Sequence, residues 1–218
     1  MPGKADLLAF DLYPVTCERL SHGRSDLEIL DALIAGGAKI VQLREKELLL
    51  RDFFDLAKAF RERTKRAGVT FIVNDHVDVC QAVQADGVHL GQDDFPVPEA
   101  RKLLGTDRII GVSTHTLEQA LKAVEEGADY INVGPIFPTQ TKEHFGDPVG
   151  LGLFREVQKR AAIPITVMGG INLHNLDSVL AAGALRIAVV SAVVGAENVA
   201  ATVKTFRERI RNYSGFSS

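Results

Sequence analysis

Three residues whose side chains can donate hydrogen bonds to an anion alternate in the segment Gln42-Leu43-Arg44-Glu45-Lys46. In an extended strand, alternate side chains point to the same face, so Gln42, Arg44 and Lys46 would share a face and Leu43 would point the other way. Burying two cations and an amide on one face costs free energy unless an anion binds to them. The segment therefore predicts an anion-binding site. The alternative is a salt bridge from Arg44 to a neighbouring acid.

Acidic residues follow the next two candidate strands. Asp75 comes directly after Phe71-Ile72-Val73-Asn74, and Asp94 belongs to the turn Gly91-Gln92-Asp93-Asp94. Mg²⁺ is commonly held by one or two carboxylates together with phosphate oxygens and water. Asp75 and Asp94 therefore predict half of a magnesium site, with Asp93 as a rival to Asp94. Capping of the helices that follow is the alternative role for these acids.

The longest polar connection follows a run of glycine and proline. It starts at Gly134-Pro135-Ile136-Phe137-Pro138 and continues with Thr139, Gln140, Thr141 and Lys142. Two prolines stiffen its approach, and the threonines and the lysine supply hydrogen-bond donors. This connection predicts a substrate-binding loop, although an ordinary surface loop would also be polar.

The elements that must position these residues alternate regularly along the chain. Apolar runs rich in β-branched residues predict strands near residues 7–16, 40–44, 70–74, 87–90, 109–113, 130–133, 165–168 and 186–190. Amphipathic stretches between them predict helices near residues 25–35, 50–66, 77–83, 98–104, 117–126, 153–161, 173–181 and 199–211. Glycines such as Gly68 and Gly127 mark helix ends, because glycine readily takes the left-handed conformation. The order predicts an α/β fold, a single-domain (β/α)8 TIM barrel over residues 1–218, with an open doubly wound sheet as the alternative.

A closed barrel would collect these polar residues at one end, because active sites of such barrels lie at the carboxyl ends of the strands. Gly169-Gly170 and Val190-Ser191 follow the seventh and eighth strands. In barrels these two connections commonly bind phosphate through backbone N–H groups, so they predict a phosphate site. Ser113, after the fifth strand, could be a helix cap or a ligand donor.

The six histidines include no pair with metal-ligand spacing and no recognisable nucleophile–base set. We expect His89, within a strand, to be structural and to face the barrel interior. We expect His115 to help start the next helix.

Charge and composition exclude several classes of protein. The 218 residues carry 28 acids and 25 bases, a formal charge of −3, and no long basic run that would favour nucleic acid. Two distant cysteines, Cys17 and Cys80, predict reduced thiols and no disulfide framework. The first residues lack the pattern of a signal peptide, and no apolar run reaches the ~20 residues that cross a bilayer. We therefore expect a cytoplasmic protein without a membrane or nucleic-acid partner.

The sequence resembles the thiamine-phosphate synthase family over nearly its whole length. The resemblance rests on segments 42–46, 72–75, 85–94, 111–113, 134–142 and 169–171, in this order and spacing. It implies an enzyme that joins hydroxymethylpyrimidine diphosphate to thiazole phosphate and releases pyrophosphate. The bond to the diphosphate would break through a carbocation-like step, with Mg²⁺ as the cofactor and small molecules as the partners.

The resemblance also assigns roles to individual residues. The pyrimidine diphosphate would be bound by Gln42, Leu43, Arg44, Glu45, Lys46, Asn74, Ser113 and Lys142, among which Arg44, Lys46, Ser113 and Lys142 would be catalytic. The thiazole phosphate would be bound by Thr139, Gln140, Thr141, Gly170, Val190 and Ser191, and Mg²⁺ by Asp75 and Asp94. This chain departs from the family at Cys17, where an acid is common, and at Met168, where a smaller or branched residue is common, and both departures concern the shape of the pocket.

Two rival functions share this barrel. A thiazole tautomerase would keep the glycine-rich phosphate site but not the metal and diphosphate residues. A non-catalytic phosphate-binding barrel would tolerate the loss of the paired acids and of Lys142. The presence of Asp75, Asp94 and Lys142 favours the synthase. A homo-oligomer is possible, and the sequence does not define it.

Overall fold

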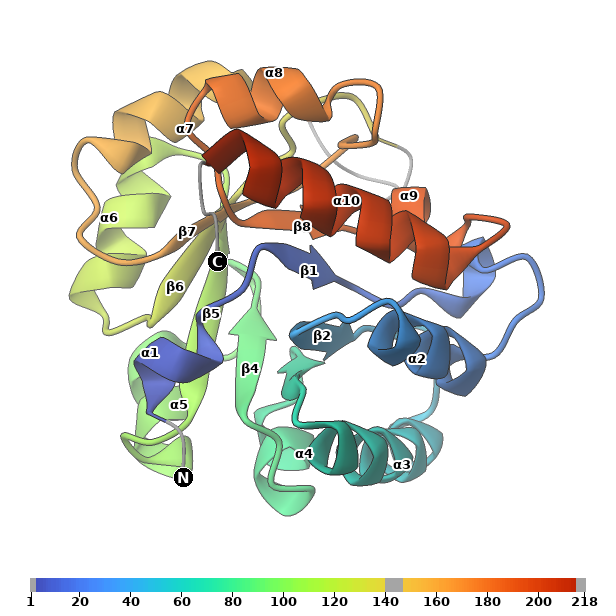
Figure 1. Cartoon of the computed structure of the whole chain (residues 1–218). Helices are drawn as coiled ribbons and strands as arrows, with labels where there is room; N and C mark the ends of the chain where they lie inside the picture. The colour runs from blue at the N-terminus through green and yellow to red at the C-terminus, as the bar shows by residue number, and fades with distance from the viewer. Residues whose placement is uncertain (1–2, 140–146, 215–218) are drawn as a thin grey trace.

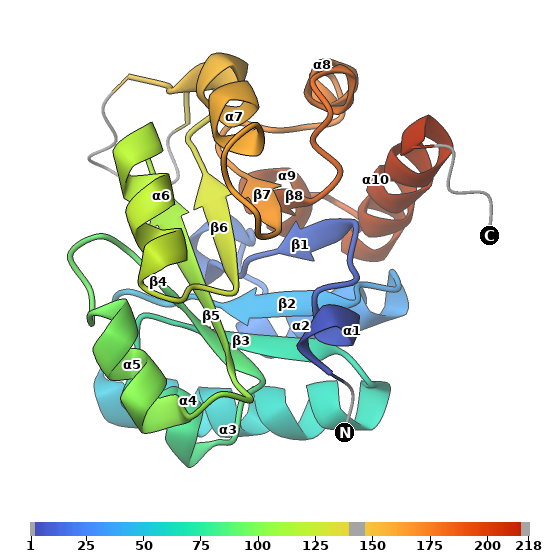
Figure 2. The same ribbon diagram turned by 90° about the vertical axis from the view of Figure 1, so that its left-hand side faces the viewer.

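The structure, a computed structural model, describes residues 3–139 and 147–214. Eight parallel strands form the centre of the molecule, and helices surround them (Figures 1 and 2). The strands are β1 (Leu12–Pro14), β2 (Ile40–Leu43), β3 (Thr70–Asn74), β4 (Gly87–Leu90), β5 (Ile109–Thr114), β6 (Tyr130–Val133), β7 (Ile165–Val167) and β8 (Ile187–Val189). The helices are α1 (Lys4–Leu7), η1 (Glu18–Leu20), α2 (Asp26–Ala35), α3 (Leu50–Ala67), α4 (Val77–Ala82), α5 (Val97–Leu104), α6 (Leu117–Glu125), α7 (Gly150–Gln158), α8 (Leu176–Ala181), α9 (Ser191–Val194) and α10 (Val199–Ser214).

The sheet closes into a barrel. Each strand pairs in parallel with the next one from β2 to β8, and β8 pairs with β1. A parallel bridge between Val15 and Gln42 joins β1 to β2, supported by the Thr16 N–H, which donates to the Gln42 carbonyl oxygen at 2.9 Å. An open doubly wound sheet would leave β2 as an edge, so the predicted (β/α)8 barrel is confirmed.

Strand alternation separates two apolar cores. On β2, Val41 and Leu43 belong to the core between the strands and the helices, while Ile40 belongs to a smaller core inside the barrel. Tyr13, Ile72 and Tyr130 lie in the same inner core. The next residue on the inner face of β2 is Gln42, so the barrel interior changes from apolar to polar toward the carboxyl ends of the strands.

The prediction of a strand from Leu7 to Thr16 is wrong at its start. Lys4–Leu7 form α1, which lies at the amino end of the barrel, and β1 begins only at Leu12 (Figure 1). The Lys4 ammonium pairs with Asp129 at 2.7 Å, and the Arg186 guanidinium donates to the Leu8 carbonyl oxygen. Residues next to β6 and β8 thus hold α1, and tertiary contacts override the extended pattern of residues 7–11.

The predicted helices hold to within a few residues at the ends, but η1 and α9 were not predicted, because they have only three and four residues. Gly68, directly after α3, has a φ of +66°, and Gly127, just beyond α6, has a φ of +91°, so the glycines that were predicted to end these helices do so. Cys17 and Cys80 are buried free thiols, as expected. No helix within residues 3–139 and 147–214 is long and apolar enough to span a membrane.

Candidate active site

A pocket opens at the carboxyl ends of the strands. The empty space within it is about 720 Å³ when the part that opens to solvent is included. Eight of the predicted site residues line it: Gln42, Arg44, Asn74, Ser113, Thr139, Gly170, Val190 and Ser191. The residues come from strand ends all around the barrel, so closure brings together groups that are up to 149 positions apart in the chain (42 to 191).

Buried polar side chains connect opposite walls of the barrel beneath this pocket. The Gln42 Nε2 donates to the Tyr13 Oη at 2.8 Å, and the Tyr13 Oη lies 2.9 Å from the Tyr130 Oη. The Tyr130 Oη lies 2.8 Å from Nδ1 of His89, and Nε2 of His89 lies 2.8 Å from the Ser113 Oγ. His89 therefore faces the interior, as predicted, and Ser113 bonds to it.

A charged cluster lies at the ends of β2, β3 and β4. The Lys46 ammonium pairs with the Asp75 carboxylate, and Asp75 is hydrogen-bonded to the Asp94 carboxyl group. Asp94 also accepts a hydrogen bond from the Gly91 N–H at 2.6 Å. Asp75 has a φ of +62°, an uncommon conformation that turns the chain sharply at the end of β3. Tertiary structure thus brings together the two acids that were predicted as metal ligands.

The donor set suits a divalent cation. Burial raises the pKa of Asp75, and the neighbouring Asp94 raises it further, against the opposing effect of Lys46. Two adjacent carboxyl groups would be better stabilised by a cation than by each other. Within residues 3–139 and 147–214, no group of three or more His, Cys, Asp and Glu side chains could hold a metal ion. Among the described residues, Asp75 and Asp94 are the two carboxylates that this cluster brings together, and phosphate oxygens and water would complete the ligands, as Mg²⁺ prefers.

The glycine side of the pocket is tightly packed. Gly169 and Gly170 have φ values of +103° and +64°, and the segment 135–138 lies directly on them. The Ile136 N–H donates to the Met168 carbonyl oxygen at 2.8 Å, and the Phe137 N–H donates to that of Gly169 at 3.0 Å. A Cβ at residue 170 would lie 2.5 Å from the Pro138 carbonyl oxygen. The glycines therefore hold the approach to Thr139 in place.

Five predicted site residues do not line the pocket, and three more are not described. Leu43 is fully buried in the core between the strands and the helices, and the Glu45 Oε1 accepts a hydrogen bond from the Glu18 N–H at 2.8 Å. The side chains of these two residues therefore point away from the pocket. The other three, Lys46, Asp75 and Asp94, form the charged cluster described above. Gln140, Thr141 and Lys142 lie outside the described residues.

Residues that the sequence reasoning did not assign also line the pocket. Nδ1 of His115 lies 2.6 Å from the Gly134 carbonyl oxygen. At the start of α6, the His115 N–H donates to the Gln119 Oε1 at 2.7 Å, and the Thr116 hydroxyl accepts from the Gln119 N–H. Asn132 accepts a hydrogen bond from the Thr166 hydroxyl at 2.8 Å, and Met168 completes the wall. Asn132 lies on the inner face of β6, so its position in the strand was a signal that could have found it.

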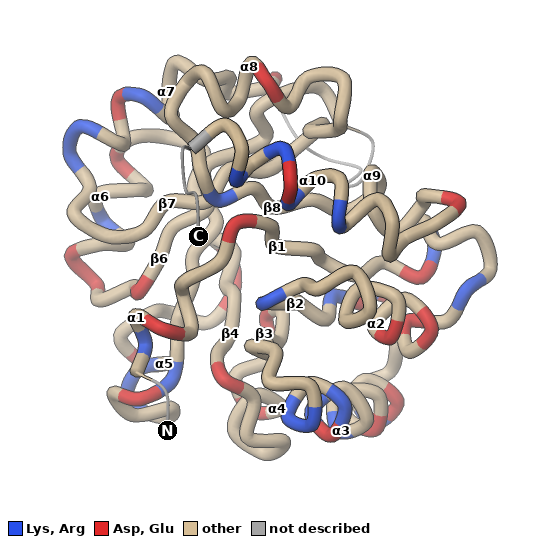
Figure 3. The backbone as a smooth tube through the Cα atoms, viewed as in Figure 1, with Lys and Arg blue, Asp and Glu red and all other residues tan. Residues whose placement is uncertain are grey.

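In the view of Figure 3, Lys and Arg are interspersed with Asp and Glu over the helices and loops. Arg44 is the Lys or Arg side chain that lines the pocket in the described part of the chain.

Comparisons with known proteins agree with this geometry. The family model for thiamine monophosphate synthase matches residues 12–193. The thiamine-phosphate synthase of Chloroflexus aurantiacus is 50% identical over 203 residues, which cover 93% of this chain and 94% of that protein. That of Moorella thermoacetica is 48% identical over 206 residues, with 94% and 98% covered. The solved thiamine phosphate pyrophosphorylase of Pyrococcus furiosus has a TM-score of 0.86 and 36% identity, covering 97% of this chain and 99% of that one. The chain belongs to the thiamine monophosphate synthase family.

Proposed function

We propose that this protein is a transferase that joins hydroxymethylpyrimidine diphosphate to thiazole phosphate, giving thiamine phosphate and pyrophosphate. The observation that carries the proposal is the two-sided site. Lys46, Asp75 and Asp94 form a charged cluster on one side, and Gly170 and Ser191 line the pocket on the other. A reaction between a diphosphate and a phosphate needs two such sides.

In the proposed reaction, the bond between the pyrimidine methylene carbon and the diphosphate oxygen breaks, and the oxygen keeps the electron pair. The thiazole nitrogen then gives its lone pair to the methylene carbon, forming the new C–N bond. Arg44 and Lys46 would stabilise the charge that grows on the leaving group, and we assign the same role to Lys142. Mg²⁺ bound by Asp75 and Asp94 would neutralise more of that charge.

The remaining residues would position the two substrates. Gln42, Asn74 and Ser113 would bind the pyrimidine, because they line the pocket beside Arg44. Thr139, Gly170, Val190 and Ser191 would bind the thiazole phosphate, and we assign the same role to Gln140 and Thr141. The buried free thiols are consistent with a reducing compartment, and we propose that the enzyme acts in the cytoplasm as a single barrel domain.

Purified protein should be mixed with both substrates and Mg²⁺, and thiamine phosphate and pyrophosphate measured by mass spectrometry. Both products should form in equal amounts, and excess chelator should stop the reaction. A tautomerase would isomerise the thiazole phosphate without the pyrimidine diphosphate, and a non-catalytic barrel would bind a substrate without turnover. Either of these results would refute the synthase assignment.

A further inference from the structure

The buried chain beneath the pocket joins two residues that face the same ligand. Gln42 and Ser113 lie on β2 and β5 and both line the pocket. Three side chains link them through four hydrogen bonds, in the order Gln42, Tyr13, Tyr130, His89 and Ser113. Tyr13 and Tyr130 are at most 1% exposed, so neither hydroxyl can turn to bulk water. Whether Gln42 donates or accepts a hydrogen bond is therefore coupled to whether Ser113 does, through this chain of side chains.

Proton counting leaves this chain of hydrogen bonds two arrangements, and the orientation of the Gln42 amide decides between them. Gln42 donates to Tyr13, so the single hydroxyl proton of Tyr13 must go to Tyr130. Tyr130 then donates to Nδ1 of His89, which leaves the ring proton on Nε2, where it is donated to Ser113. Burial raises the pKa of both phenols, so both remain protonated at neutral pH.

The chain has one other arrangement, in which every bond is reversed. Gln42 would then turn its amide oxygen toward Tyr13, and the Ser113 hydroxyl would donate to His89. The two arrangements present different groups to a ligand. In the first, Gln42 keeps its amide oxygen as an acceptor beside one remaining N–H, and Ser113 keeps its hydroxyl proton as a donor. In the reversed one, Gln42 turns both of its amide N–H groups toward the ligand.

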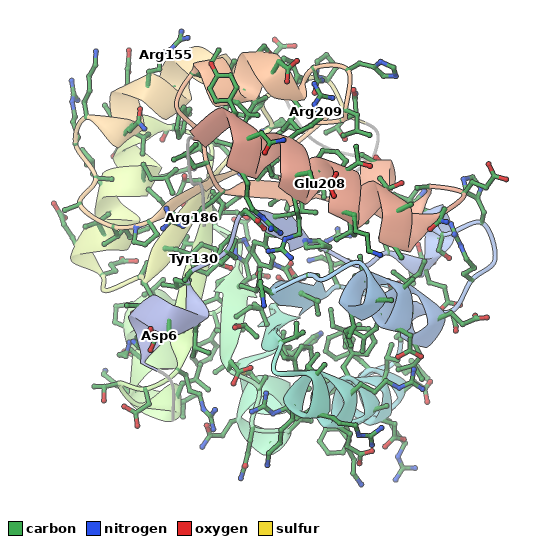
Figure 4. All side chains as sticks on the ribbon, in the orientation of Figure 1. Asp6, Tyr130, Arg155, Arg186, Glu208 and Arg209 are labelled. Carbon is green, nitrogen blue, oxygen red and sulfur yellow. The ribbon has the colours of Figure 1, made fainter. Side chains whose placement is uncertain are left out.

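The packing around Tyr130 holds the middle of the chain in place. A Cβ at Gly111 would lie 2.0 Å from Cζ of Tyr130 and 2.4 Å from its Oη, so only glycine leaves room for this ring. The Tyr13 and Tyr130 rings meet edge to face, with centroids 6.0 Å apart. Side chains crowd the region around Tyr130, which is labelled in Figure 4.

We propose that Tyr13, Tyr130 and His89 are positioning residues, which set the hydrogen-bonding polarity of Gln42 and Ser113 and thereby select the pyrimidine. The inference rests on the proposed function, because it concerns the ring of that substrate. An acceptor at Gln42 suits a ring that carries an amino group, which donates. It disfavours the corresponding ring with an oxo group, which can only accept at that position. The hydrogen-bonded chain of Tyr13, Tyr130 and His89 thus makes the enzyme selective for an aminopyrimidine.

The test compares the parent with Tyr130→Phe, Tyr13→Phe and the double variant. Each is assayed for kcat and KM with the aminopyrimidine diphosphate and with its oxo counterpart. Either single change breaks the chain and lets Gln42 turn. The KM for the amino substrate should rise about tenfold, as expected for one disrupted neutral hydrogen bond, and kcat should change less. The ratio of kcat/KM for the amino substrate to kcat/KM for the oxo substrate should fall by at least tenfold, because the turned Gln42 amide can donate a hydrogen bond to the oxo group.

The double variant supplies a signature that a merely structural role would not produce. Since either change breaks the same chain, the double variant should lose little more selectivity than one single variant. Ile72→Val is the matched control, because it thins the same inner core without touching the chain, and its selectivity should equal the parent's. Thermal unfolding checks that each variant folds. If Tyr130→Phe does not fold, His89→Gln breaks the chain one position further along.

Selectivity that stays at the parent's value in the tyrosine variants would overturn the proposal, and so would losses that simply add in the double variant. A parent that binds the aminopyrimidine diphosphate but forms no thiamine phosphate would refute the proposed function alone. The chain would then still be tested by calorimetric binding of the amino and oxo diphosphates to the same variants.

Discussion

Replacement of Gly170 by alanine should disable the enzyme by displacing the segment that leads to Thr139. The substitution adds one methyl group at a φ of +64°. Its Cβ would lie 2.5 Å from the Pro138 carbonyl oxygen and 2.8 Å from Cβ of Phe137. Backbone atoms cannot swing aside as the end of a long side chain can. The segment 135–138 must therefore move, and Thr139 must move with it.

The size of the effect follows from the geometry. An ordinary carbon–oxygen contact needs roughly an ångström more than the space available, and a misplacement of about 1 Å in an active site can cost about a hundredfold in rate. We expect kcat/KM to fall by about two decades. The left-handed conformation of an alanine costs about 1 kcal/mol, and the crowding adds about 1–3 kcal/mol. For a chain of this size, each kcal/mol lowers the unfolding temperature by about 2–4 °C.

Gly68→Ala is the matched control. Gly68 has nearly the same φ, +66°, but nothing lies within 4 Å of the added Cβ, and it ends α3 away from the residues that line the pocket. This variant should lose about 1 kcal/mol of stability and keep its activity. Steady-state kinetics and thermal unfolding of both variants show whether Gly170→Ala loses activity that Gly68→Ala keeps. A Gly170→Ala enzyme as active as Gly68→Ala would show that the segment does not need this packing.

Three further predictions concern charge. Asp75→Asn should raise the Mg²⁺ concentration needed for half-maximal rate and lower kcat, and a magnesium titration unaffected by this change would exclude Asp75 as a ligand. Burial, together with the neighbouring Glu45, raises the pKa of Asp26 to about 8, so the folded protein should lose stability as pH rises from about 4 through 8. Asp26→Asn should therefore raise the unfolding temperature more at pH 9 than at pH 5. Asp31→Asn, on the exposed face of α2, is the control and should not show this difference between the two pH values. Equal shifts for Asp26→Asn at pH 5 and pH 9 would contradict the raised pKa of Asp26. Lys142→Ala should lower kcat about a hundredfold or more while weakening pyrimidine diphosphate binding far less, and single-turnover chemistry at the parent rate would refute that role.

Much of the site could be predicted because local sequence controls it. Parallel strands of a closed barrel end at one mouth, so Gln42, Arg44 and Asn74 had to gather there once the strands were located. The alternation of side chains also put Leu43 on the face opposite Gln42, and the structure confirms it. The resemblance nevertheless implied that Leu43 binds the diphosphate, and its buried side chain does not line the pocket.

The tertiary structure decided what depends on contacts between distant segments. Tyr13 and Tyr130 are 117 positions apart, and no local pattern signals that their hydroxyls meet and link Gln42 to Ser113. The sequence by itself determined the barrel, the helix ends and the residue types at the strand ends, because periodicity and backbone preference act over a few residues. Which of those residues touch, and the direction in which their protons point, follow only from the closed barrel, where burial forces each polar group to find a partner.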